Sequence, residues 1–220
     1  MPKVKLVISS SESSFRTTLP PLLTSLVASG VSPKDVAVVV VNAKDGDEFD
    51  MIEMPMPNGA DDIRVDASFV SSTNALTWAV SDHTVLEGYD WLFLLHDATT
   101  VMPHFAQRLP EVLDEALRRD QYTSAVKLCR THSRSMGYYK VDAVWAVRDA
   151  ICAPVDPAEP AEDLGFRLIE RAGGRVDALR PHEGCDAHDV VMRQGREWRR
   201  ETHLHPGIYT YHNDLKSWAP

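Results

Sequence analysis

The chain has 220 residues, of which 44% are hydrophobic and 25% charged, and its formal net charge is -9 at pH 7. This length fits one globular domain, since domains hold about 100–200 residues, and the acidic balance argues against a general nucleic-acid coat, which needs a surplus of Lys and Arg. No segment approaches the roughly 18 apolar residues of a membrane helix, and three cysteines without a Cys-x-x-Cys spacing argue against a disulfide framework or zinc knot, so we expect a cytoplasmic protein.

The first half of the chain alternates strand-like and helix-like segments. Residues 4–9 form an apolar, β-branched run that ends in a serine-rich loop, and residues 19–29 carry leucines at helical spacing before Gly30. The valine run 36–41 is typical of a strand buried on both faces, hence parallel and central. Further strands are predicted at 63–65 and 91–95, and further helices at 72–82 and 110–119.

The second half has fewer helices. The pattern predicts strands at 124–129, 138–147 and 175–179, a helix at 162–172 that ends at Gly173 and Gly174, and a mobile lid at 180–201. Alternating strands and helices indicate an α/β fold, with a central mixed, mostly parallel sheet flanked by helices.

Polar residues follow three predicted strands, in residues 9–14, 42–47 and 96–100. Ligands of open α/β sheets bind outside the carboxyl ends of the strands, where the strand order reverses. No Gly-x-Gly-x-x-Gly follows the first strand and no Walker lysine is present, which argues against a dinucleotide site or a P-loop. A nucleotide would instead be held by side chains and backbone of the serine-rich loop.

Asp97 directly follows a buried strand and is well placed to hold a divalent ion, because hard cations such as Mg²⁺ take oxygen ligands. The alternative is structural: Asp97 caps the following turn while His96 packs against the sheet edge. Later, Glu162 and Asp163 stand at the start of a predicted helix, where the helix dipole stabilises negative charge. A carboxylate in this place also suits a general base aimed at an acceptor hydroxyl.

Taken in order, these stretches resemble the glycosyltransferases of the GT-A type, particularly family 2. The resemblance covers residues 4–179 and rests on an ordered set of motifs. Four segments carry it: an asparagine-containing helix at 73–76, a metal motif at 94–99 (Leu-Leu-His-Asp-Ala-Thr), an acceptor-side strand at 136–141 (Met-Gly-Tyr-Tyr-Lys-Val) and a base helix at 162–168. It implies a single domain over 1–220, with a nucleotide-sugar-binding half (1–101), an acceptor half (102–179) and a lid with C-terminal tail (180–220).

For function, the resemblance implies transfer of a sugar from a nucleotide-diphosphate donor, with a UDP-sugar favoured, to an acceptor hydroxyl with inversion. Asp163 would be the base, with Glu162 as the second candidate. The implied substrate contacts are Ser9, Ser10, Asn42, Asn74, Asp97, Thr99, Gly137, Trp198 and Arg200.

The metal motif departs from the family, which has a second carboxylate where this chain has Thr99. The resemblance implies Mn²⁺ or Mg²⁺ on Asp97, and a C-terminal histidine would complete the site. His205 is the preferred ligand, with His203 and His212 behind it, since residues at i and i+2 point the same way on a strand. The alternative for each is a surface histidine.

The predicted lid gathers basic residues around Trp198, and it would close over a diphosphate and exclude water or form a solvated helix face. The basic residues are Arg193, Arg196, Arg199 and Arg200. Two other functions stay open. The missing second carboxylate favours a catalytically silent nucleotide-sugar-binding module. A nucleotidyltransferase shares the sheet and the metal, but residues 9–14 lack the Gly and Lys of its usual loop.

Overall fold

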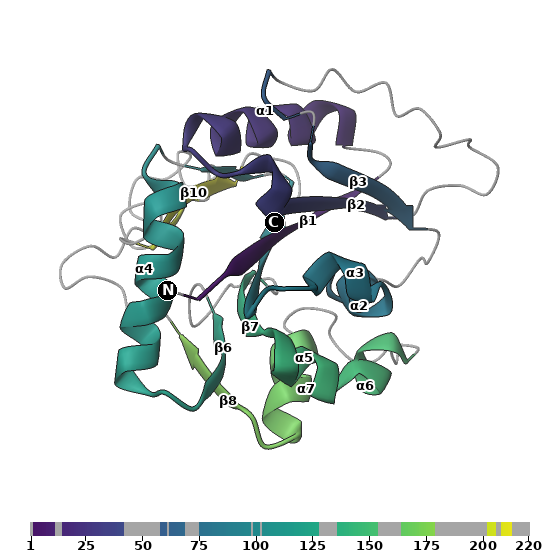
Figure 1. Ribbon diagram of the computed structural model, residues 1–220, viewed down its shortest axis with the longest axis vertical. Helices are drawn as coiled ribbons and strands as arrows, with labels where there is room; N and C mark the ends of the chain where they lie inside the picture. The colour runs from purple at the N-terminus through teal and green to yellow at the C-terminus, as the bar shows by residue number, and fades with distance from the viewer. Residues whose placement is uncertain are drawn as a thin grey trace, which may run out of the picture.

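The computed structural model describes residues 2–11, 15–41, 58–60, 62–68, 75–97, 99–101, 103–127, 136–153, 164–178, 202–205 and 208–212. Within them, a seven-stranded sheet is covered by helices on both faces, as Figure 1 shows. The strands of this sheet are β1 (Val4–Ser11), β2 (Val36–Val41), β3 (Arg64–Ser68), β4 (Trp91–His96), β6 (Thr123–Lys127), β7 (Gly137–Lys140) and β8 (Arg175–Ala178).

The sheet is mostly parallel, with the strand order β3-β2-β1-β4-β7-β6-β8. β1 pairs in parallel with β2 and β4, and β2 with β3. β7 is antiparallel to both β4 and β6, and β6 is parallel to β8. Six strands therefore run in one direction and only β7 in the other, which confirms the predicted mixed, mostly parallel α/β sheet.

The helices divide the core into two layers. They are α1 (Phe15–Ala28), α2 (Ala75–Ser81), α3 (His83–Leu86), α4 (Phe105–Arg119), α5 (Val141–Ala146), α6 (Arg148–Cys152) and α7 (Leu164–Arg171), with a 3₁₀ turn at Pro33–Asp35. Leu6 and Ile8 of β1 share a buried cluster with α1 and α4, whereas Val7 packs on the other face with α2, α5 and α7. Both faces of the central strands are buried, which is why their sequences are continuous apolar runs.

One predicted element differs in type from the structure. Residues 138–147 were expected to form one strand, but β7 ends at Lys140 and α5 begins at Val141. Val141 and Val144 are both buried at a helical spacing of three, so packing against the second core layer overrides the strand propensity of valine. The predicted helix at 72–82 corresponds to α2, and a separate short helix, α3, follows it, because Asp82 accepts a hydrogen bond from the Thr84 amide at 3.0 Å and caps α3.

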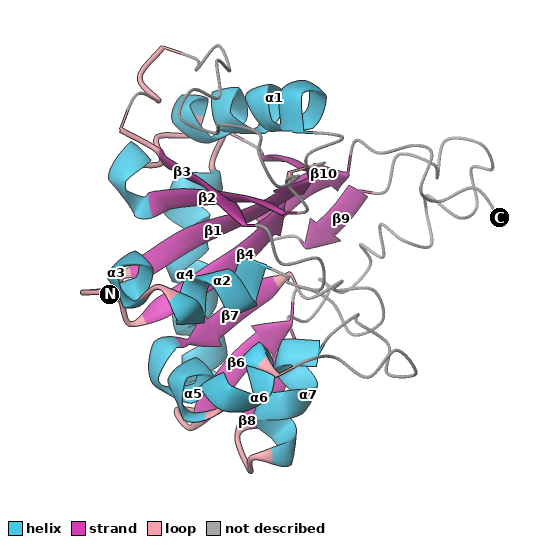
Figure 2. Cartoon of the chain, turned by 90° about the vertical axis from the view of Figure 1, so that its right-hand side faces the viewer, coloured by secondary structure: helices cyan, strands magenta, loops and turns pink. Residues whose placement is uncertain are grey.

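A second sheet has three strands in the order β5-β10-β9. β5 (Thr99–Val101) follows Asp97, and β10 (Ile208–His212) and β9 (Thr202–His205) come from the C-terminal segment, which Figure 2 shows beside the larger sheet. All pairs in this sheet are antiparallel, with His212 opposite Thr99 and His205 opposite Ile208. The C-terminal segment thus returns to the strand that follows the predicted metal motif. None of the helices in the described residues is long and apolar enough to cross a membrane.

Candidate functional site at the ends of β1 and β4

The strand order reverses between β1 and β4. From β1 the chain adds β2 and β3 on one side, and then returns to place β4 on the other. Ser9 at the end of β1 lies directly opposite His96 at the end of β4. This is the switch point at which open α/β sheets bind ligands, so the structure places the serine-rich strand end and the His96–Asp97 motif side by side.

Asp97 is buried at this point, with 1% of its surface exposed, and it contacts three other residues. Its Oδ2 accepts hydrogen bonds from the Ser10 hydroxyl and from the Thr18 hydroxyl, both at 2.5 Å. Its Oδ1 lies 3.0 Å from Nδ1 of His96. One carboxylate therefore joins the end of β1, the first turn of α1 and the end of β4.

The contacts of Asp97 keep its carboxylate ionised. Burial by itself raises the pKa of Asp97, but the hydrogen bond and charge of His96, together with the two hydroxyls, outweigh burial and lower the pKa below its ordinary value. A buried carboxylate with these partners is more stable charged than neutral at neutral pH.

The same contacts bear on the predicted metal site. Asp97 is almost completely buried, so an ion could bind its carboxylate directly only if neighbouring groups moved aside. Among the described residues no three His, Cys, Asp or Glu side chains form a group that could hold a metal. Asp97 in this arrangement does not fit a directly bound ion, and its described partners are Ser10, Thr18 and His96.

The start of α7 lies at the same edge of the sheet. A short turn through Gly173 reverses the chain, since the Gly173 amide donates to Glu170 and the Gly174 amide to Ile169, and β8 follows at once. β8 runs in the direction of β1 and β4, so α7 runs against them and begins where they end. Phe166 in its first turn reaches Gly137, which pairs with Leu94 near the end of β4. Glu162 and Asp163 lie outside the described residues.

Gly137 is required by packing. Its φ is +148°, and a Cβ at this position would lie 2.3 Å from the carbonyl oxygen of Val126 and 3.1 Å from Cζ of Phe166. The backbone of β6 therefore approaches too closely for any side chain. This packing brings β7 and α7 together beside the site, and the contact of Gly137 with substrate stays a prediction.

We expect Gly137→Ala to lower the free energy of unfolding by about 2–6 kcal/mol, because backbone strain and overpacking each cost about 1–3 kcal/mol. Gly88→Ala is the matched control: its φ is +79° and nothing lies within 4 Å of an added Cβ, so it should lose only the roughly 1–2 kcal/mol of a left-handed backbone. Urea denaturation measures both. Equal losses for the two variants would contradict the packing argument.

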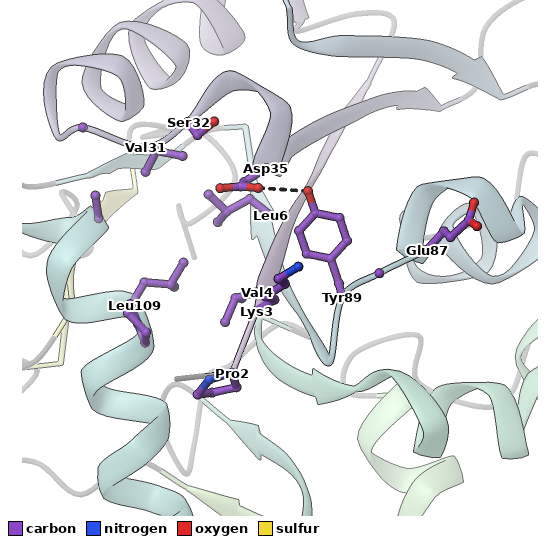
Figure 3. Close-up of a pocket in the computed structure, with 14 residues that line it drawn as sticks. Pro2, Lys3, Val4, Leu6, Val31, Ser32, Asp35, Glu87, Tyr89 and Leu109 are labelled. Carbon is purple, nitrogen blue, oxygen red and sulfur yellow. Dashed lines mark hydrogen bonds between the residues drawn. The ribbon is translucent and has the colours of Figure 1, made fainter.

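A cavity of about 560 Å³ lies at the opposite, amino edge of the sheet. Figure 3 shows its apolar lining from Val4, Val31 and Leu109, and the hydrogen bond that the Tyr89 hydroxyl donates to Asp35 at 2.9 Å. Burial, followed by this contact, raises the pKa of Tyr89 to about 12, so the hydroxyl remains a donor. Because ligands of this class of sheet bind at the carboxyl ends, we do not assign the cavity to the predicted chemistry.

Three solved structures have a similar fold. Staphylococcus aureus TarS matches with a TM-score of 0.53 and 11% identity over 80% of this chain and 35% of TarS, and TarS 1–349 in complex with UDP-GlcNAc with 0.52 and 11% over 80% and 56%. The Pyrobaculum calidifontis mannosyltransferase PcManGT, in complex with GDP-Man and Mn²⁺, matches with 0.50 and 12% over 90% of this chain and 62% of that one. No family model and no curated protein matches the sequence.

The chain has a GT-A-like fold. This likeness establishes the architecture, and it leaves donor, acceptor and mechanism to be proposed. The chain spans less than two thirds of the length of each of these proteins.

The structure describes some of the predicted site residues, and others lie outside the described residues. Ser9 is half-buried at the switch point, and Ser10 is buried against Asp97. Only the backbone is described for Thr99 and His205. The predicted contacts outside the described residues are Asn42, Asn74, Trp198 and Arg200.

Sequence reasoning missed Thr18 and assigned His96 only to packing at the sheet edge. Thr18 lies in the first turn of α1 and meets Asp97 across a separation of 79 residues, so no local pattern identifies it. The position of His96 next to Asp97 in the sequence could have identified it as a site residue. The direction of its ring could not be predicted, because it depends on the contact between Nδ1 and the carboxylate.

Proposed function

We propose that the protein is a glycosyltransferase similar to family 2 of the GT-A type, which transfers a sugar from a nucleotide-diphosphate donor to an acceptor hydroxyl with inversion. A UDP-sugar is the favoured donor. The proposal is supported chiefly by the meeting of the β1 and β4 ends with the start of α7 at one edge of a GT-A-like sheet.

In this proposal the donor lies across the ends of β1 and β4. Ser9, Asn42 and Asn74 contact the base or ribose, and the 180–201 segment closes over the diphosphate with Trp198 and Arg200. Closure of this kind excludes water and strengthens the electrostatic contacts inside the site.

The transfer step needs a base on the acceptor side. The acceptor oxygen attacks the anomeric carbon on the face opposite the diphosphate, which leaves with the electron pair of the broken bond. Asp163, or Glu162 in its place, takes the proton of the acceptor hydroxyl as the new glycosidic bond forms. A carboxylate suffices because the hydroxyl becomes acidic only as the oxocarbenium-like sugar develops.

A divalent ion, Mn²⁺ or Mg²⁺, would supply positive charge near the leaving diphosphate when bound. His205 is the ligand predicted from the sequence. The strand register favours His212 over His205, because His212 lies opposite Thr99 whereas His205 lies opposite Ile208. The protein steps above do not depend on the ion.

Donor binding provides the direct test. Saturation at about 100 times the dissociation constant stabilises a protein by roughly 2.7 kcal/mol, which for a chain of this size is a rise in Tm of about 5–10 °C. We expect such a rise with one nucleotide class when UDP-, GDP-, dTDP- and CMP-sugars are screened with and without Mn²⁺. A flat response to every donor, confirmed by calorimetry, would contradict the proposal.

A catalytically silent nucleotide-sugar-binding module is the second candidate, and Thr99 in place of a carboxylate favours it. The two candidates separate on hydrolysis of the bound donor. A transferase releases nucleoside diphosphate slowly in the absence of acceptor, whereas a silent module binds the donor and leaves it intact.

A further inference from the structure

The cavity at the amino edge of the sheet has the size of a small-molecule site. Its volume of about 560 Å³ falls within the roughly 300–1,000 Å³ of ligand pockets. Four parts of the described chain line it: the start of β1, the turn between α1 and β2, the turn before β4, and α4. Since β1 and β4 begin at this cavity and end at the switch point, a ligand here would not compete with a donor.

The walls of the cavity are an incompletely covered part of the core. Leu6 of β1 and Leu109 of α4 are buried in the layer that also contains α1. Val4 and Val31 pack against the same layer but are only partly buried, and Figure 3 shows both beside the cavity. An apolar body placed here would remove these side chains from water, which is favourable.

Asp35 provides a carboxylate oxygen at the cavity wall. Its Oδ1 accepts the hydrogen bond of the Tyr89 hydroxyl, while no partner of Oδ2 is found in the described part of the chain. In Figure 3 the second oxygen points away from Tyr89, on the side of Val31. The single proton of the Tyr89 hydroxyl is directed to Asp35 and to the carbonyl of Lys34 at 3.1 Å, so it is not free for a ligand.

A second acceptor lies in α4. A helical carbonyl accepts a bond from the N–H four residues later, but Pro110, which lies inside α4, has no N–H. The carbonyl of Ala106 therefore lacks its usual helical partner, and both residues line the cavity. These acceptors favour a ligand that donates hydrogen bonds.

We propose that this cavity is a second binding site, which takes a small molecule with an apolar body and one protonated amine. The amine donates to Oδ2 of Asp35, and the apolar body packs on Val4, Val31 and Leu109. A charged donor suits an ionised carboxylate better than a neutral one, because charge-assisted hydrogen bonds are the stronger kind. The site does not depend on the proposed transferase function.

The cations near Asp35 leave this role open. Lys5 feels the charge of Asp35, but its ammonium donates to the carbonyl of Lys34 at 2.6 Å, and Lys5 does not line the cavity. Lys3 does line it, but Lys3 is exposed, and exposed charges interact only weakly with their neighbours. The half-buried carboxylate of Asp35 is therefore expected to dominate the choice of ligand.

Three probes with one phenyl body test the choice: 2-phenylethylamine, 2-phenylethanol and 3-phenylpropionate. Nuclear magnetic resonance titration of the ¹⁵N-labelled protein should show saturable shifts of the amides at 31, 35 and 89 with the amine. We expect the alcohol to bind about tenfold more weakly, since it lacks the charge-assisted bond, and the carboxylate to bind more weakly still. UDP should not displace the amine.

Two variants separate the charge from the cavity. Asp35→Asn keeps an oxygen for the Tyr89 hydroxyl but loses the charge, so the affinity for the amine should fall by about tenfold while that for the alcohol stays the same. Ala106→Phe fills the cavity from α4 and should abolish the shifts with every probe. Asp142→Asn is the matched control, because Asp142 is exposed on α5 and does not line the cavity; it should bind all probes as the wild type does.

The inference would be overturned if no probe gave a saturable shift at these amides up to millimolar concentration. It would also be overturned by equal affinities for the amine and the carboxylate, by an unchanged amine affinity in Asp35→Asn, or by displacement of the amine by UDP. The comparison of probes uses the wild-type protein, so it decides the charge of the ligand even if a variant does not fold.

Discussion

Asp163→Asn is expected to lower the rate of sugar transfer by about 10²- to 10⁴-fold, the usual contribution of a general base, while donor affinity stays close to that of the wild type. The amide keeps the size of the side chain but cannot accept the acceptor proton. Rates under saturating donor and acceptor measure the first effect, and calorimetry with the donor measures the second.

The expectation rests on where α7 begins. The helix starts at Leu164, next to Asp163 in sequence, and Phe166 in its first turn packs against Gly137 near the end of β4. We therefore expect the carboxylate that precedes this helix in the sequence to act at the edge where the donor would bind. Glu162→Gln is the matched control and should retain most of the activity. Transfer at the wild-type rate by Asp163→Asn, with loss in Glu162→Gln, would assign the base to Glu162.

Asp97→Ala is expected to lower the free energy of unfolding by about 3 kcal/mol, because buried hydroxyls that lose an acceptor cost about 1–3 kcal/mol each. Ser10 and Thr18 would both lose their bond to Oδ2. For a chain of this length the loss corresponds to a fall in Tm of about 6–12 °C. Asp62→Ala, at an exposed position, is the control and should change stability by less than about 0.5 kcal/mol.

The contribution of Asp97 should also depend on pH. Its pKa is lower in the folded protein than in the unfolded chain, so the unfolded chain binds the proton first and stability falls as pH falls. The contribution is complete above the unfolded value of about 4 and is lost as pH drops through the lower folded value. The difference in unfolding free energy between wild type and Asp97→Ala should therefore shrink below about pH 4. A difference that stays constant down to acid unfolding would show that the charge of Asp97 contributes nothing.

Strong local patterns identified most of the fold. The valine run at 36–41 and the apolar run at 91–95 became the central parallel strands β2 and β4, since a strand covered on both faces must be apolar throughout. The prediction was wrong at 138–147. Its valines suit either a strand or a buried helix, and packing against the second core layer makes residues 141–146 a helix. The short helix α3, which Asp82 caps, was also not identified from periodicity.

The sequence alone determined the class of fold, the switch-point motif at 96–97 and the glycosyltransferase resemblance, because burial and strand ends leave periodic, local traces in the residue order. Tertiary structure decided what those residues do. In the sequence, Asp97 follows a strand, which is the place expected of a metal ligand. In the structure, Asp97 is buried against Ser10 and Thr18, and the neighbouring His96 is the exposed residue. These contacts span up to 87 residues of chain, and the side chain that a carboxylate meets over such a distance depends on how the strands and helices pack.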